Sequence, residues 1–174
     1  ARVQAYDPVA MEEAERIYRT IALGALKYFI LKVDPRKNML FNPVESINFN
    51  GNTGPFIQYT HARIKSLLRK ANRKELDFEK VEPSSMKDSE KEILKKLTLY
   101  PAVINEAAKE KSPSIIANFT FELVKLYNHF YQDVPVLKEK DRNVVDFRLA
   151  MSMFVGNVVR SSMELLGINV PDKM

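Results

Sequence analysis

Two groups of side chains in this sequence could act on a ligand, and only one of them forms a coherent set. Catalysis by this chain alone would need a nucleophile beside a base, a metal, a phosphate loop or paired carboxylates in a cleft. The turn at residues 51–54 could be imagined around a phosphate, but it lacks the Lys-Ser/Thr of a P-loop. His61 and His129 are far apart in sequence and cysteine is absent. We therefore expect neither a metal cluster nor a catalytic site.

Cations and aromatic rings form the second group. Lysine and arginine attract a phosphate backbone, whereas reading an exposed RNA loop needs aromatic faces and polar groups. One predicted helix carries few acids on its polar side, which holds His61, Arg63, Lys65, Arg69, Lys70, Arg73 and Lys74. A second ends in an aromatic and polar cluster, Tyr127, Asn128, His129, Phe130 and Tyr131. The chain thus has both kinds of residue, although periodicity alone predicts these rings in a core.

The first of these helices follows a turn that sets its direction. Two glycines and two asparagines at residues 50–54 predict left-handed or tightly turned backbone. Pro55 suits the first helical position, where a missing N–H costs nothing. The apolar residues that can share the buried side of this helix are Phe56, Ile57, Ile64, Leu67 and Leu68.

Helical periodicity elsewhere predicts an all-α bundle of about six to seven helices, because no segment alternates with period two. Asp7-Pro8 is expected to open a helix over about 8–30, with a mostly buried stripe of Ile17, Ile21, Leu23, Ala25, Leu26 and Phe29. A connector broken by Asp34-Pro35 and Asn42-Pro43 follows, and residues 72–88 are expected to be a surface linker. The remaining predicted helices start at a Ser89/Glu92 capping box, at Pro101, at Pro113 (to about 132) and at Asp141, the last ending near Gly167.

Composition sets wider limits. A chain of 174 residues with 45% hydrophobic residues can form one domain, or one domain with a subdomain. Its start does not read as a signal peptide, and no run of about 18 apolar residues is present, so a soluble, cytoplasmic protein with no membrane contact is expected. The net charge of +5 favours a polyanionic partner but also fits an ordinary basic surface.

One string is specific at fixed spacing: Phe49-x-Gly51-Asn52-Thr53-x-Pro55-Phe56-x-Gln58-Tyr59-x-x-Ala62-Arg63. It closely resembles the segment that opens the C-terminal helical domain of arginyl-tRNA synthetases. Two further stretches match in order, Gly24-Ala25-Leu26-Lys27-Tyr28-Phe29 and Leu165-Leu166-Gly167-Ile168 through Pro171 to Met174. The ATP-site signatures His-Ile-Gly-His and Lys-Met-Ser-Lys-Ser are absent. The resemblance therefore implies a C-terminal fragment, inactive alone, of a monomeric arginine-tRNA ligase that uses ATP and Mg.

The resemblance also implies roles for parts of the chain. Residues 1–55 would contact the tRNA stem, and residues 56–174 would bind the anticodon of arginine tRNA, without any cofactor in this chain. An aromatic on the 113–132 helix and the terminal Met174 would lie against anticodon-loop bases. Tyr127 matches that aromatic best when the sequence is aligned with the family. Tyr131 is the alternate, because alignment gaps near residues 132–140 leave the register of the alignment open. The expected tRNA-binding residues are Tyr127, Tyr131, Met174, Arg63, Arg69, Arg73, Asn52 and Gln58.

A different class of function also fits the residues: a helical protein-interaction module whose basic face is merely solvated. The salt dependence of tRNA binding would separate the two, because phosphate contacts weaken steeply as salt rises.

Overall fold

The computed structural model describes residues 8–72 and 86–174, and this part of the chain is helical with no strand. It contains seven α-helices and one 3₁₀ turn: α1 (Pro8–Leu31), α2 (Pro43–Ser46), α3 (Gly54–Ala71), α4 (Asp88–Thr98), α5 (Tyr100–Glu110), α6 (Pro113–Asp133), η2 (Val136–Lys138) and α7 (Arg142–Leu165). The predicted all-α bundle is confirmed. Arg73, Asp7 and most of the predicted linker lie outside the described residues.

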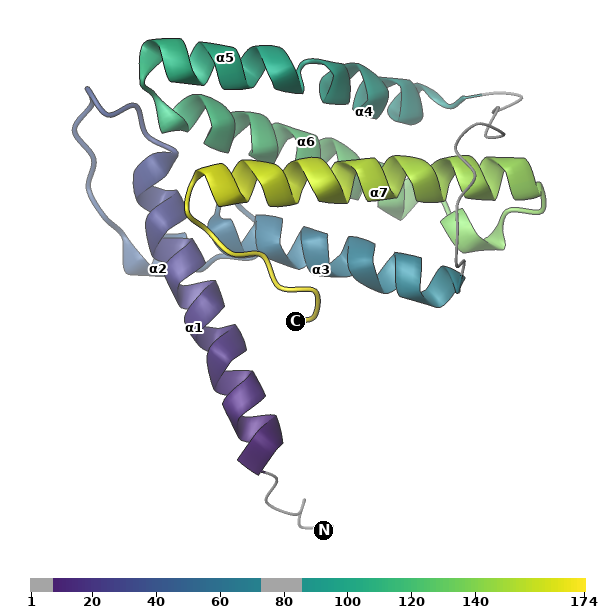
Figure 1. The fold of residues 1–174 in the computed structure, drawn as a ribbon, viewed down its shortest axis with the longest axis horizontal. Helices are drawn as coiled ribbons and strands as arrows, with labels where there is room; N and C mark the ends of the chain where they lie inside the picture. Colours follow the sequence, from purple (N-terminus) through teal and green to yellow (C-terminus); the bar gives the residue numbers. More distant parts are fainter. Residues whose placement is uncertain (1–7, 73–85) are drawn as a thin grey trace.

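The centre of the fold is formed by α3, α6 and α7, which pack against one another, while α4 and α5 cover α6 on the side away from α3 (Figure 1). Their apolar faces meet in a core that contains Ile57 and Ile64 of α3, Leu123, Tyr127 and Phe130 of α6, and Val155 and Val159 of α7, all fully buried. These residues recur at helical spacing, which is why periodicity located them.

Helix α1 crosses the start of α3 and then projects away from the bundle (Figure 1). From residue 11 onward, where the structure describes the side chains of α1, those that are buried lie near the crossing and include Ala25 and Phe29. The predicted stripe was therefore wrong in part, because Leu23 and Leu26 are 44% and 42% exposed. The described residues offer no neighbour to cover that side of the projecting helix. None of the helices within 8–72 and 86–174 is both long and apolar enough to cross a membrane.

The ends of two helices test the capping predictions. The carboxylate of Asp141 accepts the backbone N–H of Asn143, and Gly167 has φ +66, so the predicted limits of the last helix are confirmed. The Ser89/Glu92 box is wrong. Helix α4 begins at Asp88, and Glu90 instead accepts the Lys87 N–H at 2.7 Å, because its other oxygen is held at 2.7 Å by the buried Arg148 guanidinium.

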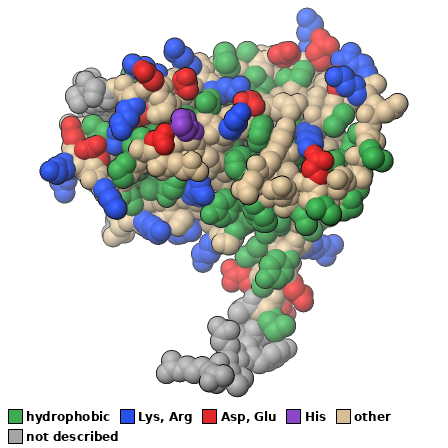
Figure 2. Space-filling view, turned by 180° about the vertical axis from the view of Figure 1, so that it is seen from behind, with side chains coloured by type: hydrophobic (Ala, Val, Ile, Leu, Met, Phe, Trp, Pro, Cys, Tyr) green, Lys and Arg blue, Asp and Glu red, His purple; other side chains and the backbone are tan. Residues whose placement is uncertain are grey.

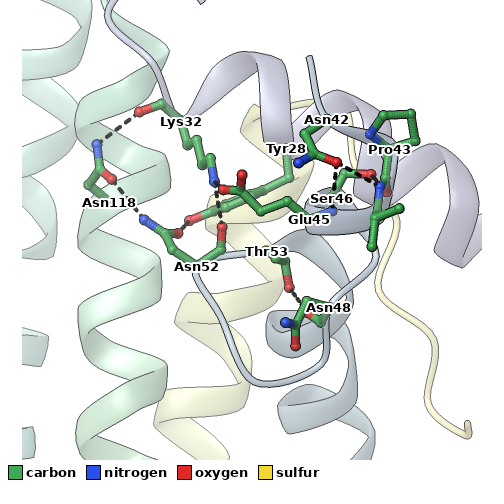
Figure 3. A network of polar contacts seen from close by, with 11 residues as sticks. Tyr28, Lys32, Asn42, Pro43, Glu45, Ser46, Asn48, Asn52, Thr53 and Asn118 are labelled. Carbon is green, nitrogen blue, oxygen red and sulfur yellow. Dashed lines mark hydrogen bonds and ion pairs between the residues drawn. The ribbon is translucent and has the colours of Figure 1, made fainter. Parts of the chain in front are cut away.

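The turn before α3 ties three helices together (Figure 3). The amide oxygen of Asn52 accepts the Tyr28 hydroxyl of α1 at 2.6 Å, and its Nδ2 lies 3.4 Å from Oδ1 of Asn118 in α6. Lys32 donates to the Asn52 carbonyl at 3.0 Å, and Thr53 caps α3 by accepting the Phe56 N–H. The side chain of Asn52 is thus engaged within the protein. Neither glycine of this turn has positive φ, so the backbone is tightly turned and not left-handed.

Candidate nucleic-acid interface

A groove of about 600 Å³ lies between α3, the C-terminal end of α6 and the last two residues of the chain. Among the described residues, two aromatic rings and four cationic side chains line it, and no acidic residue does. The lining residues are Tyr59, Ala62, Arg63, Ser66, Arg69, Lys70, Tyr131, Lys173 and Met174. Positive charge beside exposed rings is the combination that single-stranded nucleic acid needs.

The guanidinium of Arg63 lies between the two rings of the groove. Its centre is 4.8 Å from the ring centroid of Tyr59 and 5.3 Å from that of Tyr131, within the range of cation–π contacts. Arg63 also donates to Oδ1 of Asn128. Asn128 is itself fixed, because its amide donates to Thr60 Oγ1 at 2.8 Å. Arg63 is therefore a positioned cation beside two aromatic rings, and a planar guanidinium is itself a group on which a base can stack.

The two aromatic candidates of α6 have different surroundings. Tyr127 is fully buried, and its hydroxyl donates to Ser152 Oγ of α7 at 3.0 Å. Burial raises the pKa of the Tyr127 hydroxyl well above its ordinary value. Its ring packs 6.1 Å from that of Tyr131, which lines the groove. Tyr127 thus supports Tyr131 from the core side and presents no face to a ligand, contrary to its choice as the best-matching aromatic.

Gln58 and His61 also lie elsewhere than predicted. The buried amide of Gln58 donates to the Thr20 carbonyl at 3.1 Å and to the Asn169 carbonyl at 2.8 Å. His61 was expected on the cationic side of α3, but it is fully buried, and its Nδ1 lies 2.9 Å from the Pro171 carbonyl. The reason is long-range, because residues 169–172 fold back over this face of α3.

The groove therefore collects part of the predicted set. Arg63, Arg69, Tyr131 and Met174 converge on it, whereas Asn52, Gln58 and Tyr127 make contacts within the protein. Lys70 was predicted only as a cation on the polar side of α3. The predicted tRNA-binding set missed the groove residues Tyr59, Ala62, Ser66 and Lys173. Helical spacing could have found the α3 members, because residues 59, 63, 66 and 70 fall on one face. Among the described residues, no group of three or more His, Cys, Asp or Glu could hold a metal ion.

The family model described as DALR anticodon binding domain matches residues 57–174, which include the whole groove. The chain belongs to this anticodon-binding family. The chain has curated relatives named arginine–tRNA ligase. It is 53% identical to the one from Bacteroides fragilis over 170 residues, 97% of this chain, and 54% identical to the one from Bacteroides thetaiotaomicron over the same length. It spans 28% of the length of both relatives.

Solved structures agree with the fold. The Thermus thermophilus arginyl-tRNA synthetase superposes with a TM-score of 0.81 at 30% identity, covering 90% of this chain and 27% of the synthetase. The Plasmodium falciparum arginyl-tRNA synthetase gives the same TM-score at 24% identity, covering 91% of this chain and 28% of that one. The second likeness concerns the fold alone.

Proposed function

We propose that this chain is the tRNA-binding part of an arginine–tRNA ligase and holds the anticodon stem and loop of arginine tRNA. The observation that carries the proposal is the groove in which Arg63 lies between Tyr59 and Tyr131 and the other charged residues are cations. The identity of 53% to curated arginine–tRNA ligases supports the assignment to arginine.

The groove residues divide the work of binding. Arg69, Lys70 and Lys173 contact phosphates and set the position of the RNA without reading its sequence. An unpaired base stacks on the Tyr131 ring beside Arg63, and Met174 gives that base an apolar edge. By holding the distant anticodon, the chain orients the acceptor end toward a catalytic part, which is a positioning contribution to the reaction.

The rest of the ligase supplies the chemistry in this proposal. It binds ATP and Mg²⁺, activates arginine and esterifies the tRNA, whereas the residues described here offer no metal-holding group. Residues 1–55 contact the tRNA stem and residues 56–174 form the anticodon-binding bundle. The protein works in the cytoplasm as a monomer.

Titration with tRNA tests the proposal. The chain is mixed with arginine tRNA and with a tRNA of different anticodon over a range of salt concentrations. We expect tighter binding of arginine tRNA and affinities that fall linearly with salt on logarithmic axes. Changing Arg69 and Lys70 together to glutamate should weaken the binding of both tRNAs and reduce the slope of affinity against salt. Lys109→Glu, at an exposed position of α5, is the matched control. Equal, salt-independent affinities would contradict the proposal.

An exchange assay tests the absence of catalysis. We expect no arginine-dependent ATP–pyrophosphate exchange by this chain, with an intact arginine–tRNA ligase as the positive control. Exchange above background by the pure chain would show that it holds an activation site.

A second function is favoured by α1 and the connector after it, where large apolar side chains remain exposed: Met11, Tyr18, Leu23, Leu26 and Ile30 on α1, then Met39, Leu40, Phe41, Val44, Ile47 and Phe49. In Figure 2 hydrophobic side chains are visible along the projecting helix and where it meets the bundle. Exposed apolar surface of this extent is typical of protein contacts. We propose that these apolar side chains contact the rest of the ligase polypeptide, while polar side chains of residues 1–55 face the tRNA stem, so the two contacts use different sides of the segment.

Polar substitution tests that contact. Leu23→Gln with Leu26→Gln should reduce any self-association of the chain and weaken its binding to a separately expressed catalytic part, while tRNA affinity stays unchanged. If tRNA affinity falls and binding to the catalytic part does not, this face belongs to the RNA site.

A further inference from the structure

The C-terminal segment does not trail away from the bundle. After α7 the chain turns at Gly167, buries Ile168, and runs back along α3 (Figure 1). Its last two residues form one side of the groove that also contains Arg63 and Tyr131. The groove therefore has this side only when the C-terminal segment lies against α3.

Side chains from two helices, α1 and α3, hold the main chain of this segment at residues 167, 169, 171 and 172. Lys27 Nζ donates to the Gly167 carbonyl at 2.6 Å, Gln58 Nε2 to that of Asn169 at 2.8 Å, His61 Nδ1 to that of Pro171 at 2.9 Å and Arg69 Nη1 to that of Asp172 at 3.0 Å. Arg160 of α7 adds a contact with the Asp172 carboxylate at 2.7 Å. Because four of the acceptors are backbone carbonyls, these contacts fix the path of the chain.

Like Gln58, His61 is a fully buried donor. Its ring is fully buried, and a carbonyl can only accept, so Nδ1 must carry the proton. Nε2 is buried without a hydrogen-bond partner among the described residues. The contact with Pro171 therefore fixes which ring nitrogen carries the proton, and Asp172 Oδ1 lies 4.0 Å from the same nitrogen.

Adjacent faces of α3 perform two tasks. Residues 58 and 61 hold the segment on one face, and residues 59, 63, 66 and 70 line the groove on the next. Arg69 lies between the two faces and does both, because it lines the groove and donates to the Asp172 carbonyl. Gln58 and His61 lie beneath the returning chain, so they are closed to RNA. Their contacts instead fix the position of residues 173 and 174 relative to the groove residues of α3.

We propose that Gln58, His61 and Arg160 are positioning residues that hold residues 169–172 on α3 and α7, so that Lys173 and Met174 close the groove on bound RNA. The proposal rests on the tRNA-binding function proposed above and deepens it, because it makes part of the affinity depend on residues that never touch the RNA.

Double-variant cycles provide the test. Each chain is compared with a version that ends at Asp172 and so lacks Lys173 and Met174. The variants are Arg160→Gln, which removes a partly exposed contact, His61→Phe, which keeps a ring without the donor, and His61→Asn, which retains an amide donor near the position of Nδ1. The dissociation constant for arginine tRNA is measured at fixed salt, and the folded fraction is determined for each chain.

We expect truncation to weaken binding by about tenfold in the unaltered chain, as loss of one apolar or ionic contact requires. In the Arg160→Gln and His61→Phe chains truncation should cost about twofold or less, because residues 173 and 174 are no longer seated. His61→Asn should resemble the unaltered chain. Hydrogen exchange of the amides at 168–174 should accelerate in the two disrupting variants while exchange in α6 stays slow, which distinguishes a local effect from general destabilisation.

Two results would overturn the proposal. One is an equal cost of truncation in the unaltered chain and in folded Arg160→Gln and His61→Phe chains. The other is unchanged exchange at 168–174 in both disrupting variants. Failure of the unaltered chain to bind tRNA is a separate outcome: it would remove the proposed function, while the exchange data would still decide whether these side chains hold the segment.

Discussion

Gly54, the first residue of α3, lies directly against the backbone of Gly24 in α1. A Cβ at residue 54 would overlap the Gly24 carbonyl, with the carbonyl carbon at 2.7 Å. The crossing of α1 and α3 therefore depends on the absence of a side chain. Gly51 in the same turn differs, because a Cβ there would meet only Thr53 Cγ2 at 3.7 Å, an ordinary contact.

The two glycines make a matched pair of substitutions. We expect Gly54→Ala to lower the free energy of unfolding by about 1–3 kcal/mol, since the helices must separate to admit the methyl group. Gly51→Ala should change it by less than about 0.5 kcal/mol, because its φ is not positive and the space is open. Urea denaturation of both variants measures this, and equal losses would mean that the crossing is not tight at Gly54.

This contrast shows what the sequence could and could not reveal. Local signals placed the helices well, as the predicted 113–132 segment became α6 (Pro113–Asp133). The glycine-rich turn was also located, and of the two expected backbones, left-handed or tightly turned, the structure has the tight turn. The sequence did not show that Gly54 serves the contact between α1 and α3. The same limit applies to His61 and Gln58, whose partners are 110 and 111 residues away. Periodicity cannot show that a distant segment covers a polar face.

The buried ion pair between Glu90 and Arg148 gives a second prediction. Their side chains are 1% and 4% exposed and meet at 2.7 Å. Glu90→Ala leaves the guanidinium buried with a weaker partner, Glu139 at 3.2 Å, so we expect a loss of about 3–5 kcal/mol in unfolding free energy. Glu139→Ala, at a 36% exposed side chain, should cost at most about 1 kcal/mol.

Thermal and urea unfolding of both alanine variants test the pair. Comparable losses at the two positions would contradict the assignment of Glu90 as the main partner of Arg148. Replacing the pair together by Gln and Met should recover part of the loss, because the second substitution removes the uncompensated charge.

The burial of His61 predicts a pH dependence of stability. Burial lowers the pKa of the His61 imidazole from its ordinary 6.5, and the positive charges of Arg160 and Lys65 lower it further, although the Pro171 hydrogen bond and Asp172 act in the opposite direction. The unfolded chain then binds the proton more readily than the folded chain. Stability should be fully present above the unfolded pKa of about 6.5 and fall as the pH drops below it, by at most about 1.4 kcal/mol per pH unit.

His61→Asn checks the source of that slope. Unfolding free energies of the two chains are measured between about pH 7 and pH 5, and we expect the difference between them to change below about pH 6.5. The pKa of the Glu139 carboxyl is also lowered, by hydrogen bonds from the Lys140 and Asp141 backbone. Its protonation changes stability only below about pH 4.5, outside the pH range of this measurement. A constant difference across this window would show that His61 does not titrate on unfolding there.

The two neighbouring tyrosines of α6 give the last prediction, which concerns the reading of bases. Tyr131 lines the groove next to Arg63, so Tyr131→Ala removes a stacking surface and should cost about 1–3 kcal/mol in tRNA binding, roughly tenfold to hundredfold in affinity. The loss should be larger for arginine tRNA than for a tRNA of different anticodon, because phosphate contacts remain. Tyr131→Phe keeps the ring and should bind nearly as the unaltered chain.

Tyr127→Phe is the matched control, because it removes only a buried hydroxyl. Losing the hydrogen bond to Ser152 should lower the unfolding free energy by about 0.5–1.5 kcal/mol and leave the tRNA affinity of the folded chain unchanged. The reverse pattern, with full affinity in Tyr131→Ala and weaker binding in a stably folded Tyr127→Phe chain, would mean that α6 turns its buried face toward the RNA on binding. Because Tyr127 packs in the core beside Phe130, 5.8 Å away, such a movement would have to open the packing between α6 and α7.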